Sequence, residues 1–125
     1  MKNLSLKSAK RAFTLVEIMI VVLIIGILLA IAIPNFIRAR EQSRAKSCSE
    51  NLKQIDAAKQ LYAMDAGLVN GSSVTISALV GPSSYIKASP LCPSTNSNTY
   101  TINDINTDPS CTNNLATYPH TVNGR

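Results

Sequence analysis

The sequence predicts an α+β fold in which one long N-terminal helix supports a small C-terminal headpiece containing β-structure. Three observations lead to this prediction. Residues 13–33 form an apolar run with a single charged residue, and a helical amphipathic pattern continues over residues 35–66. The remaining residues, 67–125, are rich in Pro, Ser, Thr and Asn and include a short strand-like stretch at 99–102.

The apolar run has the length of a membrane-spanning helix. Its 21 residues would extend about 31 Å, which matches a hydrocarbon core of about 30 Å. We therefore expect a transmembrane helix over residues 13–34. A secretory signal peptide cleaved after Ala32 is disfavoured, because the run exceeds a usual hydrophobic region and Pro34 follows the cut. An ordinary single-pass anchor remains an alternative.

Glu17 is the only charged residue between Arg11 and Arg38. A carboxylate inside an apolar span costs about 2.5–3.5 kcal/mol on insertion scales, so it indicates a functional site by default. In a simple anchor, by contrast, Glu17 would merely be tolerated.

A basic leader, residues 1–12, ends in KRA and is followed directly by FTLVEIMIVV, with Gly26 and the stretch AIAIPNF at residues 30–36 further on. Through these segments the first third of the chain resembles the N-terminal segment of type IV pilins and type II secretion pseudopilins. The resemblance implies cleavage between Ala12 and Phe13 by a prepilin peptidase, and methylation of the new Phe13 amine. The family usually has Gly before the cut, where this chain has Ala12.

The resemblance also implies a role for Glu17 in assembly. Glu17 lies one helical turn after Phe13, on the same face. A buried carboxylate and a buried ammonium stabilise each other, since either alone is costly. The partner would be the Phe13 amine of a neighbouring subunit, although pairing with the chain's own amine remains open. The family likewise implies that the helix loosens between Gly26 and Pro34 on assembly; a simple kink at Pro34 is the other interpretation.

An amphipathic helix is predicted over residues 35–66, ending at Gly67 as a C-cap glycine. Its apolar stripe comprises Phe36, Ile37, Ala45, Cys48, Leu52, Ile55, Ala58 and Tyr62. The charged residues, assigned to the remaining face, are Arg38, Arg40, Glu41, Arg44, Lys46, Glu50, Lys53, Asp56 and Lys59. Because acids alternate with bases, this pattern indicates a solvated helix face, and we predict no nucleic-acid partner.

The headpiece, residues 67–125, is of a size that needs a covalent staple or a packing partner. A Cys92–Cys111 disulfide would close a loop of about 20 residues, contributing about 3 kcal/mol in the chain-entropy model. That pairing favours an oxidising, extracytoplasmic compartment. Cys48 is interpreted as a small buried hydrophobe.

The headpiece also resembles short pilin-like proteins with a Cys-Pro motif, through YIK at residues 85–87, PLCPS at 90–94 and PSC at 109–111. Those proteins usually carry Gly-Gly after Cys-Pro, where this chain has residues 95–98, TNSN. The acidic stretch 104–108 is interpreted as a polar loop in preference to a calcium loop. His120, the only histidine, is expected at the surface. No Cys/His spacing resembles a zinc motif, so we expect no metal and no cofactor.

These patterns predict a structural subunit of a type IV pilus or a type II secretion pseudopilus, not an enzyme. The expected partners are other copies or other pilin-like subunits, the prepilin peptidase, and the inner membrane with its assembly platform. The expected location is the bacterial inner membrane, single-pass with the headpiece outside the cytoplasm, and then the pilus or periplasmic pseudopilus. The alternatives are a membrane-tethered binding module that does not polymerise, and a DNA-uptake or conductive filament.

Overall fold

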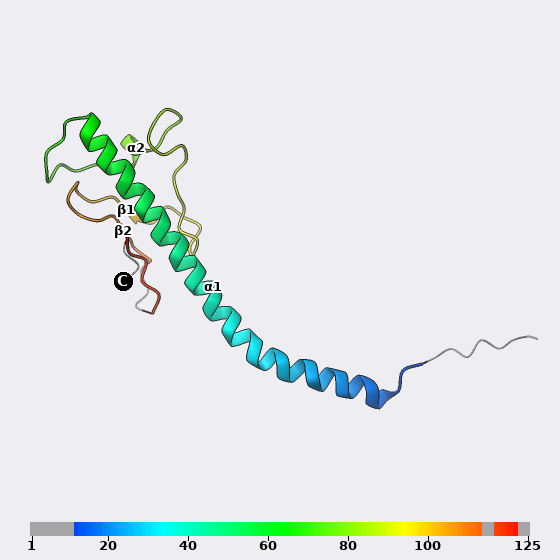
Figure 1. Ribbon diagram of the computed structural model, residues 1–125. Coiled ribbons are helices and arrows are strands. Elements are labelled where there is room, and N and C mark those ends of the chain that lie inside the picture. Colours follow the sequence, from blue (N-terminus) through cyan, green and yellow to red (C-terminus); the bar gives the residue numbers. More distant parts are fainter. Residues whose placement is uncertain (1–11, 114–116, 123–125) are drawn as a thin grey trace, which may run out of the picture. The chain divides into compact units, whose positions relative to one another are not determined.

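The computed structural model describes residues 12–113 and 117–122, and its element order confirms the α+β class (Figure 1). The elements are α1 (Leu15–Asp65), α2 (Ile76–Leu79), β1 (Tyr100–Thr101) and β2 (Ser110–Cys111). The chain divides into two compact units, Met1–Ile37 and Arg38–Arg125. Helix α1 contributes to both, and each unit is described by itself.

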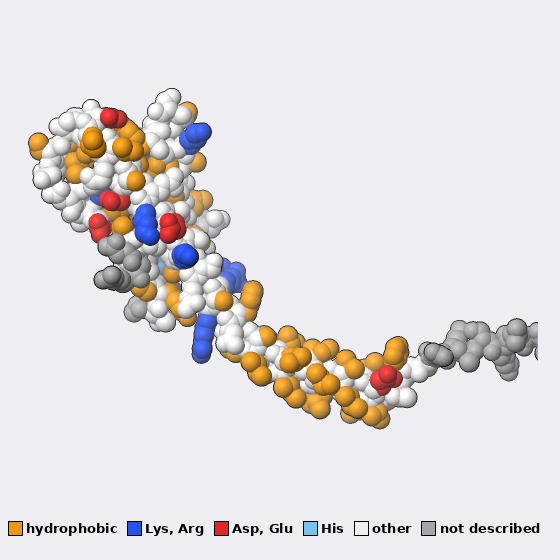
Figure 2. Space-filling view, in the orientation of Figure 1, with side chains coloured by type: hydrophobic (Ala, Val, Ile, Leu, Met, Phe, Trp, Pro, Cys, Tyr) orange, Lys and Arg blue, Asp and Glu red, His pale blue; other side chains and the backbone are white. Residues whose placement is uncertain are grey.

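In the first unit, α1 is apolar around its whole circumference. Its large hydrophobic side chains from Leu15 to Ile37 are all exposed, and Figure 2 shows them covering the visible face with one acidic side chain near the beginning of the helix. The helix continues through Pro34, although proline removes one backbone hydrogen bond there. A helix that is apolar all round requires lipid or other helices around it.

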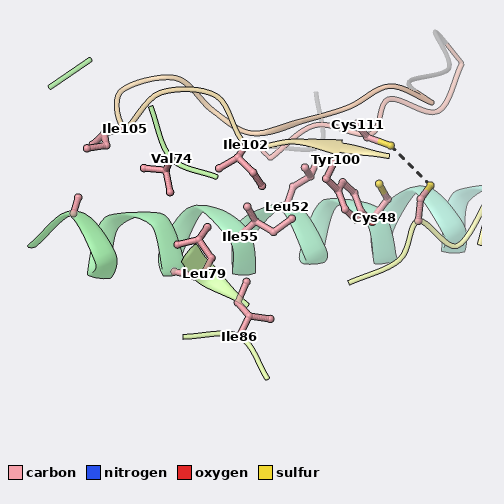
Figure 3. Close-up of a cluster of buried hydrophobic side chains, with 13 residues drawn as sticks. Cys48, Leu52, Ile55, Val74, Leu79, Ile86, Tyr100, Ile102, Ile105 and Cys111 are labelled. Atoms are coloured by element: carbon pink, nitrogen blue, oxygen red, sulfur yellow. Dashed lines mark hydrogen bonds between the residues drawn. The ribbon is translucent and has the colours of Figure 1, made fainter. Parts of the chain in front are cut away.

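In the second unit, one stripe of α1 forms the floor of the headpiece core. Cys48, Leu52 and Ile55 are fully buried and face residues of the headpiece such as Ile102 and Leu79 (Figure 3). The predicted stripe is confirmed from residue 45 onward. Its first two members, Phe36 and Ile37, are exposed instead and belong to the apolar surface of the first unit.

Helix α1 ends in a Schellman motif. The Leu68 N–H donates to the Ala63 carbonyl at 2.9 Å, and the Gly67 N–H donates to the Met64 carbonyl at 3.4 Å. Gly67 adopts a φ of +62°, in the left-handed region where glycine has no steric penalty. The predicted C-cap at Gly67 is therefore confirmed, and Leu68 turns back onto the core.

The headpiece contains little regular structure beyond this helix. Strands β1 and β2 form an antiparallel pair with Tyr100 opposite Cys111, and isolated bridges such as Ser73 with Asp104 join other loop segments. Side chains of α1 hold several loops directly. Asn51 Nδ2 donates to the Leu91 carbonyl and to the Tyr100 hydroxyl, each at 3.0 Å.

Candidate functional site

The predicted cleavage bond lies in exposed, non-helical backbone. Residues 12–14 precede the first turn of α1 and are exposed, and the Phe13 side chain is 77% accessible. The Ala12–Phe13 peptide bond thus lies in exposed backbone just before the helix begins at Leu15. The cleavage itself stays a prediction, and the leader residues 1–11 lie outside the described part of the chain.

Thr14 and Glu17 form part of a capping box at the beginning of α1. The Glu17 backbone N–H donates to Thr14 Oγ1 at 3.2 Å, which places Thr14 at the N-cap and Glu17 at the third helical position. A carboxylate in the first turn also complements the helix dipole. Glu17 therefore helps to begin the helix within its own chain. The sequence pattern T-x-x-E could have indicated this local role, which we did not predict.

Around Glu17, the described part of the first unit offers no other charge. Glu17 is the only charged residue in the stretch 12–37, and α1 is the one helix among the described residues that is long and apolar enough to cross a membrane. Gly26 and Pro34 both lie within this continuous helix. A Cβ added at Gly26 would meet nothing within 4 Å, so packing inside this chain does not require glycine there.

A second polar feature lies in the headpiece, where Lys59 is fully buried. Its ammonium donates to the carbonyls of Asp104 at 3.0 Å, Thr107 at 2.5 Å and Ile102 at 3.4 Å, and it pairs with Asp56 at 3.4 Å. The assignment of Lys59 to the solvated face was wrong, because the side chain is fully buried and its ammonium is satisfied by these carbonyls instead of water.

The contacts of Lys59 show how the polar stretch at residues 104–108 is held in place. Backbone oxygens of the kind that could coordinate a calcium ion are directed at the lysine ammonium. Gln60 Nε2 holds the same loop by donating to the Ile105 carbonyl at 3.0 Å. The segment is thus a loop clamped to α1 through its main chain.

The three cysteines and His120 come together at one end of the core. Figure 3 shows Cys48 on α1 and Cys111 on β2 with their sulfur atoms facing the same space. The Sγ atoms of Cys92 and Cys111 are 3.8 Å apart, and one ligand atom from each of the four residues lies within 4.8 Å of all the others. All three cysteines are free thiols, so the Cys92–Cys111 disulfide stays a prediction.

The expected surface position of His120 was wrong, since its exposed fraction is 2%. The C-terminal segment that carries it is held against α1 by Ser49, whose hydroxyl donates to the Thr121 carbonyl at 2.7 Å. Sequence spacing could not reveal that His120 is buried beside the three cysteines, because the four residues come from separate segments of the chain. The interpretation of Cys48 as buried is confirmed, with an exposed fraction of 0%.

The environment gives the thiols different acidities. Burial raises the pKa of Cys48 to about 12. Burial also opposes ionisation of Cys92, but hydrogen bonds from the backbone of Ser94 and Thr95, together with those from the Thr95 hydroxyl and the Cys111 thiol, lower its pKa to about 7. The turn that supplies these donors closes through Asn96, which adopts a φ of +53°.

Comparisons with known proteins agree with these features. Residues 7–33 match the family model described as the prokaryotic N-terminal methylation motif. The chain is 52% identical over 52 residues to the type IV major pilin protein PilA of Myxococcus xanthus, covering 42% of this chain and 24% of that protein. It is 35% identical over 68 residues to the type II secretion system core protein G of Pseudomonas aeruginosa, covering 54% and 48%.

A third relative is matched over most of its length. The ComG operon protein 3 homolog of Bacillus licheniformis is 31% identical over 84 residues, covering 67% of this chain and 82% of that protein. The chain thus spans about a quarter of the Myxococcus pilin, about half of the secretion protein and most of the ComG protein. No solved structure matches significantly. Together with the apolar helix, its single carboxylate and the small headpiece, these matches establish that the chain belongs to the type IV pilin and type II secretion pseudopilin family.

Proposed function

We propose that this chain is a structural subunit of a type IV pilus or a type II secretion pseudopilus, assembled through the first unit of α1. One observation carries the proposal. The whole apolar surface of this helix is exposed, and Glu17 is its only charge between residues 12 and 37. Such a surface is stable first in lipid and then among identical helices, whereas water would oppose its exposure.

Processing prepares the helix for assembly. A prepilin peptidase cleaves the exposed Ala12–Phe13 bond, and the new Phe13 amine is methylated, which keeps its positive charge. The amine then lies at the positive end of α1, two residues before the helix begins. The family match over residues 7–33 supports this step.

The Phe13 ammonium of one subunit pairs with the Glu17 carboxylate of a neighbour in the filament core. In an apolar environment an unpaired charge is strongly unfavourable, so the pair selects the axial register in which both charges meet. The capping contact between Thr14 and the Glu17 backbone N–H uses no carboxylate oxygen, so the side chain keeps its acceptors for a neighbour. Gly26 and Pro34 let the helix loosen as it leaves the bilayer.

The subunit is held in the bacterial inner membrane before assembly, with its headpiece outside the cytoplasm. Its partners are further copies or other pilin-like subunits, the peptidase and the assembly platform. The length of the apolar helix and the family of the matched relatives support membrane anchoring.

The test replaces Glu17 with Gln in a strain without the wild-type copy. Glu17→Gln keeps the side-chain shape and removes the charge, so we expect normal cleavage, accumulation in the membrane and loss from sheared filaments or pseudopili. Glu50→Gln is the matched control, because the same chemical change falls on an exposed side chain of the second unit; it should assemble normally. The mass of the mature N-terminus is measured in both variants, which separates an assembly defect from a methylation defect.

Two results would contradict the proposal. If Glu17→Gln enters filaments as well as Glu50→Gln does, the intersubunit ion pair is wrong and Glu17 acts only at the beginning of its own helix. If the wild-type chain itself stays in the membrane and never appears in sheared material, the chain is a tethered module that does not polymerise.

A further inference from the structure

Four side chains with metal-binding atoms converge in the headpiece although they are far apart in the sequence. Cys48 comes from α1, Cys92 from the turn closed by Asn96, Cys111 from β2 and His120 from the C-terminal segment. All four residues are buried, and their ligand atoms lie within 4.8 Å of one another. Ordinary hydrophobic packing does not require three sulfur atoms and an imidazole to share one small space.

The separations suit a tetrahedral ion. Zinc binds thiolate sulfur at about 2.3 Å and imidazole nitrogen at about 2.0–2.1 Å, so the edges of its tetrahedron are about 3.8 Å between sulfurs and about 3.6 Å between sulfur and nitrogen. The Cys92 and Cys111 sulfurs are already 3.8 Å apart. The widest separation of 4.8 Å exceeds the tetrahedral edge by about 1 Å, a distance that small side-chain rotations cover.

The ligand set also selects the class of metal. Three thiolates and one imidazole are soft and intermediate donors, which favour zinc over the oxygen-seeking ions calcium and magnesium. Among the described residues, no carboxylate belongs to the cluster. Four protein ligands complete a tetrahedron, which is the arrangement of structural zinc sites, whereas catalytic sites keep one position open.

A metal ion bound by these four residues would link segments of the headpiece that no described helix or sheet joins to one another. The two-stranded sheet contains only two residues in each strand, and the C-terminal segment is held to α1 by Ser49. One ion bound to α1, the 92–97 turn, β2 and the C-terminal segment would cross-link all four. Small domains with limited cores commonly use such a staple.

We propose that Cys48, Cys92, Cys111 and His120 form a structural zinc site in the headpiece. Binding replaces the three thiol protons by three Zn–S bonds and releases those protons to solvent, while the neutral imidazole supplies its nitrogen lone pair. The site and the Cys92–Cys111 disulfide exclude each other, because the disulfide brings these sulfurs to about 2.05 Å and removes their thiolate charge.

The experiment uses the full mature chain, purified in detergent under anaerobic conditions with a non-thiol reductant. We expect one zinc per chain by elemental analysis. Replacement of zinc by Co²⁺ should produce thiolate charge-transfer bands and the intense visible bands of tetrahedral cobalt. Cys48→Ser is the decisive variant, because it leaves the Cys92–Cys111 pair intact; its affinity for Co²⁺ should fall at least tenfold, and that of His120→Gln should fall similarly.

Ile55→Val is the control for general damage to the core. Ile55 is fully buried on the same helix as Cys48 and donates no ligand, so this variant should bind one metal with unchanged cobalt bands. Circular dichroism of each variant at the assay temperature shows whether the headpiece is folded when binding is measured. Should Cys48→Ser or His120→Gln unfold without metal, the wild-type stoichiometry and cobalt spectrum still decide the proposal.

Three outcomes would overturn it: reduced wild-type chain that binds neither zinc nor cobalt, Cys48→Ser that binds cobalt as tightly as wild type, or a cobalt spectrum without thiolate charge transfer. A Cys92–Cys111 disulfide in material from cells, with no metal taken up after its reduction, would show that the cluster serves the disulfide alone.

Discussion

Replacing Lys59 with Met tests whether the buried ammonium holds the headpiece loop to α1. Lys59 is fully buried, and its closest contacts are the carbonyls of Asp104 and Thr107 at 3.0 and 2.5 Å. Methionine retains most of the apolar stem and removes only the donor and its charge. The substitution therefore isolates the hydrogen bonds from the packing.

The expected loss of stability follows from the groups left behind. The Asp104 carbonyl still accepts from the Thr107 N–H at 3.1 Å, so the Thr107 carbonyl is the one that loses its close donor. An acceptor left without a partner costs about 1–3 kcal/mol when it is buried. The contacts at 3.4 Å with Ile102 and Asp56 add little, because they are long and Asp56 is 30% exposed. Removing the buried charge relieves part of its desolvation penalty. We expect the free energy of unfolding to fall by about 1–2 kcal/mol.

The assay is urea unfolding of the mature chain in detergent, followed by tyrosine fluorescence. The protein has four tyrosines and no tryptophan, and all four tyrosines lie in the second unit, so the signal reports headpiece unfolding. Lys53→Met is the matched control. Lys53 also pairs with an acid three residues before it, at 3.4 Å, but both side chains are more than half exposed. Its loss should stay below about 1 kcal/mol.

The reasoning would be refuted if Lys59→Met and Lys53→Met were equally stable within about 0.5 kcal/mol. That result would mean that water or a rearranged loop satisfies the carbonyls as well as the ammonium does. A lower m-value in Lys59→Met would instead show that the 102–108 loop is already detached in the native state.

Three further predictions concern the ends of α1 and one exposed tyrosine. Intact-mass analysis of membrane-extracted protein should show a mature chain beginning at Phe13 with an added methyl group; an uncleaved leader would contradict the processing step. Gly67→Ala should lower headpiece stability by about 1–2 kcal/mol in the urea assay, because alanine is strained at a φ of +62°. Gly26→Ala, in the helix interior with open space around it, should not reduce it. The Tyr85 hydroxyl donates to Asp65, and this bond raises the pKa of Tyr85; its contribution to stability is present at neutral pH and disappears as the pH rises through the raised value. Spectroscopic titration should show Asp65→Asn returning the tyrosine to its ordinary range, and an unchanged titration would exclude the bond.

Features with a local physical cause could be predicted from the sequence. The apolar run, the helical stripe after residue 45 and the Gly67 cap depend on side chains within a few turns of one another. The predicted helix, residues 13–66, differs from α1, Leu15–Asp65, by one or two residues at each end. Family membership could be predicted for the same reason, because the leader, the junction and Glu17 form one continuous segment.

The headpiece depended on contacts between distant segments. Lys59 has the charge pattern of a solvated residue, and only the folded loop at 102–107 supplies the carbonyls that make its burial favourable. His120 likewise has no local signal for burial, because its position depends on Ser49 holding the C-terminal segment against α1.

The amino-acid sequence by itself determined one long helix, with an apolar N-terminal half, a single carboxylate and a glycine at its end, because helix formation and membrane affinity depend on local composition and spacing. The tertiary structure alone decided which polar groups the headpiece buries and that three cysteines meet one histidine. Those outcomes arise because loops with little preference for helix or strand find hydrogen-bond partners for their backbone groups on α1. Only the folded chain brings such partners within bonding distance.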